Sequence, residues 1–301
     1  MYFSLENIGP ILYKRISLIL FTFSIYMNKN VALVYMVAGM SSRFWGKIKQ
    51  FAKIWPNNSS LIEYSLHQAL PAWFSKIIFI VGKMTQQPFK EMFGDSYQWI
   101  PVEYALQTFD ESLRDRPWGT VDALCSAKQY IDWPFVVCNG DDIYWAHSFK
   151  LLFDHLQNSD ESASLWYILE NVMPEVWSTN RWIFTIDAEK YIQDIHEYIW
   201  IEKKTLSEIW LHTKDLCSMN IFWLTLPDLE LLYTILLRFK AQHIWDRKIE
   251  CYLPVEIATI IREEWVRMKL YSTSDTWFWV TNPEDEEIVR KQIQKYENNL
   301  I

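Results

Sequence analysis

The run VALVYMVAGMSSR occupies residues 31–43 and decides the fold. Its first part, residues 31–37, is continuously apolar, which is typical of a strand covered on both faces in a parallel sheet. Small residues follow, and such a turn exposes successive backbone N–H groups that can hold a phosphate group. Arg43, Lys47 and Lys49 add positive charge. Taken alone, the run fits equally well an ordinary strand-to-helix turn with exposed basic residues, and it is not a P-loop because GxxxxGK[ST] is absent.

Strand and helix patterns alternate after this run. In the first half we predict strands over residues 76–82, 102–106 and 135–138, and helices over residues 61–70, 88–94, 120–131 and 148–157. In the second half we predict partly antiparallel strands over residues 182–186, 191–195, 217–224 and 266–271, and helices over residues 228–240, 255–264 and 283–296. This alternation predicts an α/β fold, a three-layer αβα Rossmann-like arrangement with a mixed, mostly parallel sheet and a substrate-binding insertion in the second half.

The first thirty residues differ from the rest of the chain. Residues 16–27 form an apolar run that is too short for a membrane span, which needs about 20 residues, and no small-residue cleavage site follows. We therefore predict that residues 1–30 are an extension that is not native or is disordered, with Met27 as the true start; a membrane-associated segment is the alternative. Because no linker appears later, residues 31–301 are predicted to form a single domain, with halves at residues 31–160 and 161–301.

Composition narrows the class of protein. The chain is 50% hydrophobic and 22% charged, which fits a globular protein with a sizeable core and excludes disorder. A formal net charge of −8 argues against a nucleic-acid partner, since no basic face is evident. The four cysteines lie far apart without a CxxC pair, so we predict reduced, mostly buried thiols, a cytoplasmic protein and no membrane partner.

Two further motifs suggest a nucleotide site. Asn139-Gly140-Asp141-Asp142 ends a predicted buried strand, where open α/β sheets bind ligands, and its adjacent carboxylates suit Mg²⁺. Gln107 can both donate to and accept from a base edge, and Gly119, just before a predicted helix, lets a base lie against the backbone. Each motif alone also fits an interpretation without a functional role, which is an exposed Asp-Asp turn for the first motif and an ordinary loop for the second.

The order of these motifs carries a resemblance. A phosphate loop, then Gln…Gly-Thr-x-x-Ala, then Gly-Asp after a hydrophobic strand resembles the sugar-nucleotidyltransferase superfamily, which includes sugar-1-phosphate uridylyl-, thymidylyl- and guanylyltransferases and cytidylyltransferase relatives. The first motif of that group, L-A-A-G-x-G-[ST]-R followed by a Lys, is similar to residues 35–43 with Lys49, although Ser41 stands where the group often has Gly. The resemblance covers about residues 31–298 and is stronger before residue 169.

The resemblance implies a role for each matching residue. The loop would bind the nucleotide through Ala38, Gly39, Met40, Ser42 and Arg43. Gln107 and Gly119 would bind the base, Asp141 would bind Mg²⁺, and Asp142 would lie beside it at the nucleotide. Arg43, Lys49 and Asp141 are the expected catalytic residues. The acceptor would contact Glu197, Lys203 and Asn220, three residues that are equally typical of an exposed surface.

The implied reaction is attack of an acceptor phosphate oxygen on the α-phosphorus of a nucleoside triphosphate, with pyrophosphate leaving and Mg²⁺ as cofactor. The acceptor would be a sugar phosphate or a similar small phosphorylated molecule. A second metal ligand has no clean match, and Asn282 and Asp285 are the only candidates. Two alternatives remain open: a glycosyltransferase in which Asp141 and Asp142 act as a DxD motif, and a non-catalytic nucleotide-binding relative.

The tryptophan content is unusual. The chain has 17 Trp and 7 Gly, whereas average usage predicts about 21 Gly. Several tryptophans stand at turn and cap positions that favour Gly, namely Trp45, Trp55, Trp73, Trp145 and Trp279. We predict that many of them are Gly in the organism because a codon is read differently there, with Trp118 and Trp277 as genuine tryptophans. An aromatic-rich core is the alternative.

Overall fold

A computed structural model describes residues 29–39, 44, 46–54, 58–174, 177–273, 275–280 and 285–298. The chain divides into two units, Met1–Asn30 and Val31–Ile301. Nearly all of the first unit lies outside the described residues, and so does the apolar run predicted at residues 16–27. The architecture below is therefore that of the second unit.

The second unit alternates strands and helices. The strands are β1 (Ala32–Met36), β2 (Lys76–Val81), β3 (Ser96–Tyr97), β4 (Ile100–Leu106), β5 (Phe135–Asn139), β6 (Asp142–Ile143), β7 (Ser162–Ile168), β8 (Thr179–Ile186), β9 (Ile192–Ile201), β10 (Leu216–Ser218), β11 (Phe222–Leu224), β12 (Met268–Ser272) and β13 (Phe278–Trp279). The α-helices are α2 (Leu61–Ala69), α3 (Gln86–Phe93), α4 (Thr120–Ser126), α5 (Ala146–Asn158), α6 (Leu226–Gln242), α7 (Leu253–Glu263) and α8 (Asp285–Asn298). Short 3₁₀ helices include η3 (Lys49–Phe51), η4 (Leu70–Ala72) and η7 (Lys203–Ile209).

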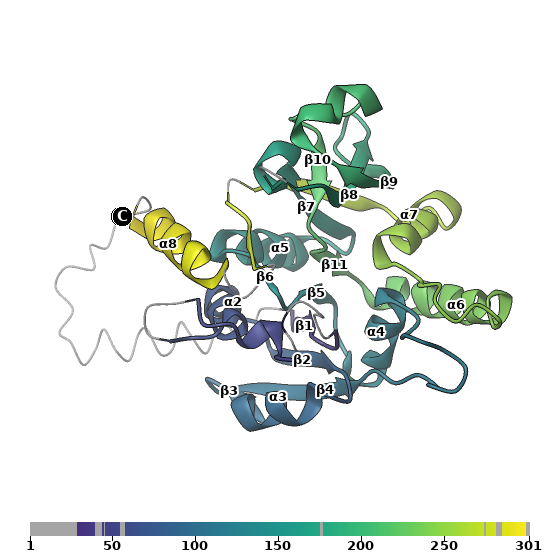
Figure 1. The fold of residues 1–301 in the computed structure, drawn as a ribbon. Coiled ribbons are helices and arrows are strands. Elements are labelled where there is room, and N and C mark those ends of the chain that lie inside the picture. Colours follow the sequence, from purple (N-terminus) through teal and green to yellow (C-terminus); the bar gives the residue numbers. More distant parts are fainter. Residues whose placement is uncertain are drawn as a thin grey trace, which may run out of the picture. The chain divides into compact units, whose positions relative to one another are not determined.

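One large sheet forms the middle layer, with the strand order β3-β4-β2-β1-β5-β11-β7-β10-β8-β9 and β12 paired to β7 (Figure 1). The strands β4, β2, β1 and β5 run parallel to one another, and β11 joins them antiparallel to β5. Beyond β11, the chain pairs β7, β10, β8 and β9 antiparallel, while β12 is parallel to β7. The sheet is therefore mixed, as the sequence predicts.

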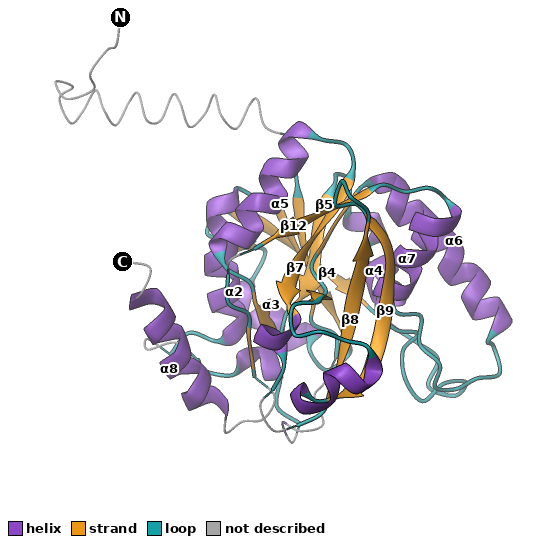
Figure 2. Cartoon of the chain, turned by 90° about the horizontal axis from the view of Figure 1, so that it is seen from above, coloured by secondary structure: helices purple, strands orange, loops and turns teal. Residues whose placement is uncertain are grey.

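Helices cover both faces of this sheet. Side chains alternate along β1, so that Leu33 and Tyr35 enter one core with α2, α3 and α5, while Val34 enters a second core with α4, α6 and α7. Figure 2 shows these two helical layers on opposite sides of the strands. The predicted αβα fold class is confirmed.

Besides the short edge strand β3, which was not predicted, two details of the sheet differ from the sequence prediction. The strand predicted over residues 217–224 is wrong as one element, because Asn220 adopts a left-handed φ of 55° and splits it into β10 and β11. The strand β7 was not predicted, although it lies in the middle of the sheet between β11 and β10. Its serines, Ser162 and Ser164, interrupt the apolar run, and both are buried with hydroxyl groups bonded to Asp228 and to the Ile221 carbonyl.

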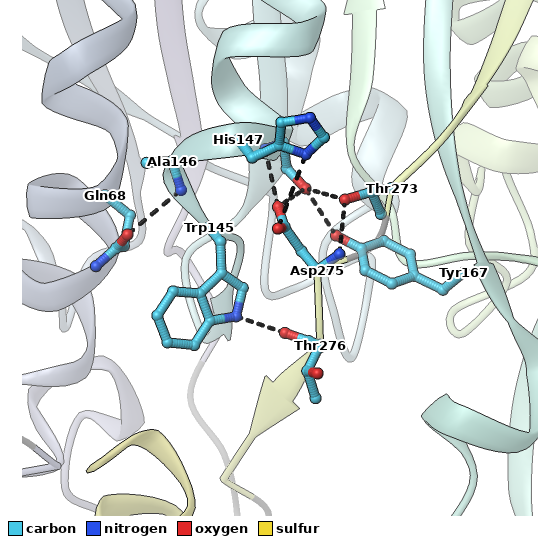
Figure 3. A network of polar contacts seen from close by, with 9 residues as sticks. Gln68, Trp145, Ala146, His147, Tyr167, Thr273, Asp275 and Thr276 are labelled. Atoms are coloured by element: carbon cyan, nitrogen blue, oxygen red, sulfur yellow. Dashed lines mark hydrogen bonds and ion pairs between the residues drawn. The ribbon is translucent and has the colours of Figure 1, made fainter. Parts of the chain in front are cut away.

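The C-terminal segment is tied to the start of α5 (Figure 3). Asp275 Oδ2 accepts the Ser148 backbone N–H at 2.9 Å and the Ser148 hydroxyl at 2.7 Å, so a carboxylate from a distant segment caps this helix. The Trp145 indole N–H donates to the Thr276 carbonyl at 2.5 Å. The segment then forms β13, which pairs with β6 through Trp279 opposite Asp142.

Within the described residues, no helix is long and apolar enough to cross a membrane. The four cysteines are free thiols; Cys138, Cys217 and Cys251 are buried and Cys125 is half-buried, in agreement with the sequence prediction. Burial raises the pKa of each thiol, to about 12 for Cys125 and Cys217.

Candidate functional site

The carboxyl ends of the parallel strands meet at one edge of the sheet. Met36 at the end of β1 lies opposite Ile80 of β2 and Asn139 of β5, and Val81 lies opposite Leu106 of β4. The segments that follow these strands therefore emerge side by side, and they include residues 37–39, Gly82, Gln107 and residues 140–142. This edge is where open α/β sheets bind ligands.

A glycine brings the acidic turn against the first loop. The Gly140 N–H donates to the Met36 carbonyl at 3.1 Å, and a Cβ at this position would lie 2.2 Å from Val37 Cγ1. Any larger residue would push the turn away from β1. Gly140 thus places the Asp141 backbone next to the predicted phosphate loop.

Lys49 and Asp141 form an ion pair at this edge. Lys49 Nζ donates to Asp141 Oδ2 at 2.7 Å, and the two side chains are 14% and 32% exposed. Lys49 begins η3, so the two residues are 92 positions apart in the sequence and meet only in the fold. Two of the three residues expected to be catalytic are therefore in contact. Arg43 lies outside the described residues, as do Met40 and Ser42.

Asp142 faces the interior behind Asp141. It is 6% exposed, its Oδ2 accepts the Asn139 side-chain amide at 2.9 Å, and the Tyr144 hydroxyl lies 3.2 Å away. Burial, and after it the charge of Asp141, raise the pKa of Asp142 to about 7, while Lys49 and the hydrogen bonds from Asn139 and Tyr144 act in the opposite direction. The structure thus orients Asp142 toward Asn139 and Tyr144 rather than alongside Asp141 at the surface.

Gln107 and Gly119 lie together, as the resemblance implies. Gln107 Nε2 donates to the Gly119 carbonyl at 3.2 Å and to Asp122 Oδ2 at 2.9 Å. Gly119 precedes α4 with φ of 100°, and a Cβ there would lie 2.6 Å from the Cys251 carbonyl oxygen. Only Gly fits this close approach of two backbones. Lys240 Nζ pairs with the other oxygen of Asp122 at 2.5 Å, so the Gln107 side chain is held in one orientation.

The predicted acceptor residues come from the second half of the sheet. Glu197 lies on β9 opposite Trp182 of β8 and is exposed. The ring of Trp182, the cross-strand partner of Glu197, packs against the ring of Tyr252 with centroids 6.2 Å apart. Tyr252 adjoins Cys251, whose N–H donates to the Trp118 carbonyl at 2.7 Å. The fold therefore brings Glu197 toward the segment that holds Gly119.

The other two acceptor candidates occupy different places. Lys203 is half-buried at the start of η7, just after β9. Asn220 lies between β10 and β11, next to Met219, whose carbonyl accepts the Tyr144 hydroxyl at 2.6 Å. Asn220 Oδ1 is buried and, among the described residues, has no hydrogen-bond partner. Such an oxygen can accept a hydrogen bond from a ligand or from a water molecule.

Sequence reasoning assigned no role to three residues around Asp142. Asn139 and Tyr144 hold its carboxylate; Asn139 belongs to the Asn-Gly-Asp-Asp motif, whereas Tyr144 follows β6 and belongs to no motif. Arg181 on β8 gave no signal. Its guanidinium donates to the Val172 carbonyl at 3.0 Å, and burial lowers its pKa while the charges of Cys217 and Asp142 oppose that shift.

The mixed sheet, covered by helices on both faces (Figure 2), defines an α/β protein of the Rossmann-like type. The family model described as nucleotidyl transferase matches residues 13–176, which is more than half of the chain. The chain belongs to this family, as the resemblance indicated. A search of curated proteins gives no match.

Solved structures with this fold cover most of the chain. The inositol-1-phosphate CTP transferase from T. maritima has a TM-score of 0.62 and 12% identity over 89% of this chain and 97% of its own. UDP-glucose pyrophosphorylase, solved with UDP-glucose, has a TM-score of 0.61 and 15% identity over 89% and 99%. HddC from Yersinia pseudotuberculosis, solved with GMP-PN, has a TM-score of 0.57 and 13% identity over 87% and 99%. At these identities the likeness concerns the fold.

Proposed function

We propose that this protein transfers a nucleoside monophosphate from a nucleoside triphosphate to a sugar phosphate or a similar small phosphorylated acceptor, with release of pyrophosphate. The observation that carries the proposal is the ion pair between Lys49 and Asp141 at the carboxyl edge of the parallel strands. A cation and a carboxylate side by side suit a triphosphate with its counter-ion. The named relatives, which include a CTP transferase and a pyrophosphorylase, support the same reaction class.

Asp141 fits a magnesium ligand. Its carboxylate is a hard oxygen donor, it is one-third exposed, and Lys49 contacts only Oδ2 in the pair described above. Within the described residues, no group of three or more His, Cys, Asp or Glu side chains could hold a metal ion. Mg²⁺ is usually held by one or two carboxylates together with substrate phosphates, and Asp141 would supply one such carboxylate. When bound, Mg²⁺ would neutralise negative charge on those phosphates.

The chain's own residues then orient the reactants. Lys49 would contribute positive charge near the α-phosphate and keep Asp141 in place through the 2.7 Å contact. Asn139 and Tyr144 fix Asp142, and through the adjacent peptide they fix the Asp141 backbone. Arg43 would add a second cation on the loop after β1.

The base is assigned to the Gln107–Gly119 corner. Gln107 Nε2 is held by Gly119 and Asp122, so we assign its side-chain oxygen to the base edge. The ring of Trp118, the residue before Gly119, is covered by the Arg114 guanidinium, which lies 3.4 Å from the ring centre and holds this ring in place. Asn220, whose Oδ1 is buried without a partner among the described residues, is assigned to the acceptor together with Glu197 and Lys203.

The test is a panel of four nucleoside triphosphates, each with several phosphorylated sugars and alcohols, with Mg²⁺. Pyrophosphate release that depends on the acceptor is the expected result. Asp141→Asn should abolish it while the protein stays folded. Asp132→Asn is the matched control, because Asp132 also pairs with a lysine, at 2.8 Å, but at the start of β2. Full activity of Asp141→Asn would remove Asp141 from the site.

The same panel separates the alternatives. Transfer of a sugar from a nucleotide sugar without pyrophosphate would indicate a glycosyltransferase and would overturn the proposal. Binding of a nucleotide without turnover across the panel would indicate a non-catalytic relative. The inward orientation of Asp142 argues against a paired DxD-type metal site.

A further inference from the structure

Tryptophan is concentrated at left-handed backbone positions. Among the described residues, nine residues other than glycine have positive φ, and five of these are tryptophans at positions 73, 99, 200, 210 and 265, with φ between 57° and 65°. Tryptophan accounts for only 17 of 301 residues in the chain. A bulky L-residue is disfavoured in this region because its Cβ meets the neighbouring carbonyl oxygen, whereas glycine has no Cβ.

Three of the five end a helix. Trp73 and Trp210 are the C-caps of η4 and η7 in left-handed conformation, with φ and ψ of 60° and 40° and of 61° and 24°. Trp210 and the following Leu211 both donate backbone N–H groups to the Leu206 carbonyl, the bond pattern of a glycine-terminated helix. Trp265 follows α7, and the next N–H, of Val266, turns back to the Ile260 carbonyl at 3.3 Å. Glycine is the usual residue at such positions.

Trp99 occupies a two-residue hairpin turn. Tyr97 of β3 pairs with Ile100 of β4, so Gln98 and Trp99 alone connect the strands. Their φ values are 44° and 65°, and positive φ at both central residues defines a type I′ turn. The second central residue of that turn is most often glycine. A tryptophan there contradicts the preference of the turn.

Trp200 occupies a β-bulge. Between the pairs Thr179–Ile201 and Arg181–Tyr198, the two residues Ile199 and Trp200 oppose the single residue Asn180. Trp200 has φ of 57°, and its N–H donates to Asn180 Oδ1 at 3.1 Å. A bulge with one left-handed residue is the kind that selects glycine.

The five side chains project into solvent. Their exposed fractions are 56% for Trp73, 87% for Trp99, 76% for Trp200, 89% for Trp210 and 85% for Trp265. Burial of the ring is the usual advantage of tryptophan, and little of it is realised at Trp99, Trp200, Trp210 and Trp265. Trp118 is the contrast, because it is half-buried against Arg114 and Phe239 and its φ is not positive.

We propose that residues 73, 99, 200, 210 and 265 are glycine in the organism, because a codon that gives tryptophan in this sequence is read as glycine there. Three kinds of local structure, a helix C-cap, a type I′ turn and a β-bulge, select the same residue independently. The glycine shortage of the chain and its tryptophan excess then share one cause. The inference concerns the backbone and does not depend on the proposed activity.

Two direct observations test the proposal. The gene should carry one codon at the five positions and a different codon at Trp118. Mass spectrometry of peptides from protein isolated from the organism should give glycine masses at the five positions and a tryptophan mass at Trp118. One codon shared by all six positions, or tryptophan masses at the five, overturns the proposal.

Recombinant protein gives a third, physical test. Each of Trp73→Gly, Trp99→Gly, Trp200→Gly, Trp210→Gly and Trp265→Gly should raise the thermal unfolding midpoint by about 2 °C or more. Trp245→Gly is the matched control, because Trp245 is 91% exposed without positive φ, and it should give no rise. Trp118→Gly should lower the midpoint. A rise in the control equal to that of the five, or a fall in the five, refutes the backbone argument.

Discussion

Asp142→Asn should change the pH dependence of stability. The pKa of Asp142 is raised to about 7 from an ordinary value of 3.8, chiefly by burial. Between these values the folded protein keeps the proton and the unfolded chain releases it. The unfolded state then binds fewer protons, so stability falls as pH rises through this window and levels off above pH 7. The stabilising contribution is fully present below the unfolded pKa. Asparagine cannot ionise, so the stability of the variant should not fall in this way as the pH rises.

The magnitude follows from the size of the shift. A difference of about three pH units at 1.36 kcal/mol each gives roughly 4 kcal/mol as the upper limit of the effect. The substitution also places an amide beside Asn139 and Tyr144, at a cost of about 1–3 kcal/mol that is independent of pH. The change of the free-energy difference with pH, rather than its absolute value, therefore isolates the titration of Asp142.

The assay is urea unfolding of both proteins with EDTA at about pH 4 and about pH 8. Between the two conditions, the free energy of unfolding of Asp142→Asn should rise by up to about 4 kcal/mol relative to that of the parent. Asp132→Asn is the matched substitution at a carboxylate whose side chain is 60% exposed. A difference for Asp142→Asn that does not change with pH would refute the argument that burial holds this proton.

Three further predictions concern Lys49, Gly119 and the N-terminal extension. Lys49→Ala should lower kcat/KM by an amount equivalent to about 1.5–3 kcal/mol. Lys76 is an equally buried lysine that pairs with Asp132, and Lys76→Ala should leave kcat/KM unchanged. Equal effects of the two substitutions would contradict the role assigned to Lys49. Gly119→Ala should lower the free energy of unfolding by more than about 1 kcal/mol, since its Cβ would lie 2.6 Å from the Cys251 carbonyl, and an unchanged urea midpoint would contradict this. A chain starting at Met27 should fold and be active; loss of folding in circular dichroism would show that the extension is structural.

Much of the fold was predictable from local patterns. The strand β1 is apolar along its whole length because helices cover both faces of the sheet. Ser60 is the N-cap of α2, and its capping box with Glu63 is a pattern that can be recognised in the sequence. The strand β7 escaped prediction because its serines are satisfied by Asp228 and by the Ile221 carbonyl, partners supplied only by the tertiary structure.

Only part of the site was predictable, because several of its contacts form only in the tertiary structure. Lys49 and Asp141 each belong to a motif, although their contact exists only once β1 and β5 pair. The inward orientation of Asp142 depends on Tyr144 and Met219, which no motif marks. Arg181 reaches this region from β8, one residue before the strand predicted over residues 182–186, and no motif marks it.

One labelling experiment tests the central claim most directly, that the carboxyl edge holding Lys49 and Asp141 performs nucleotidyl transfer. The protein is incubated with Mg²⁺, a phosphorylated sugar and nucleoside triphosphate labelled at the α-phosphorus or, separately, at the γ-phosphorus. The account predicts that the α-label enters a nucleotide-linked product and the γ-label leaves in pyrophosphate, with both transfers lost in Asp141→Asn and kept in Asp132→Asn. Release of the γ-label as inorganic phosphate, or transfer that survives in Asp141→Asn, would contradict it.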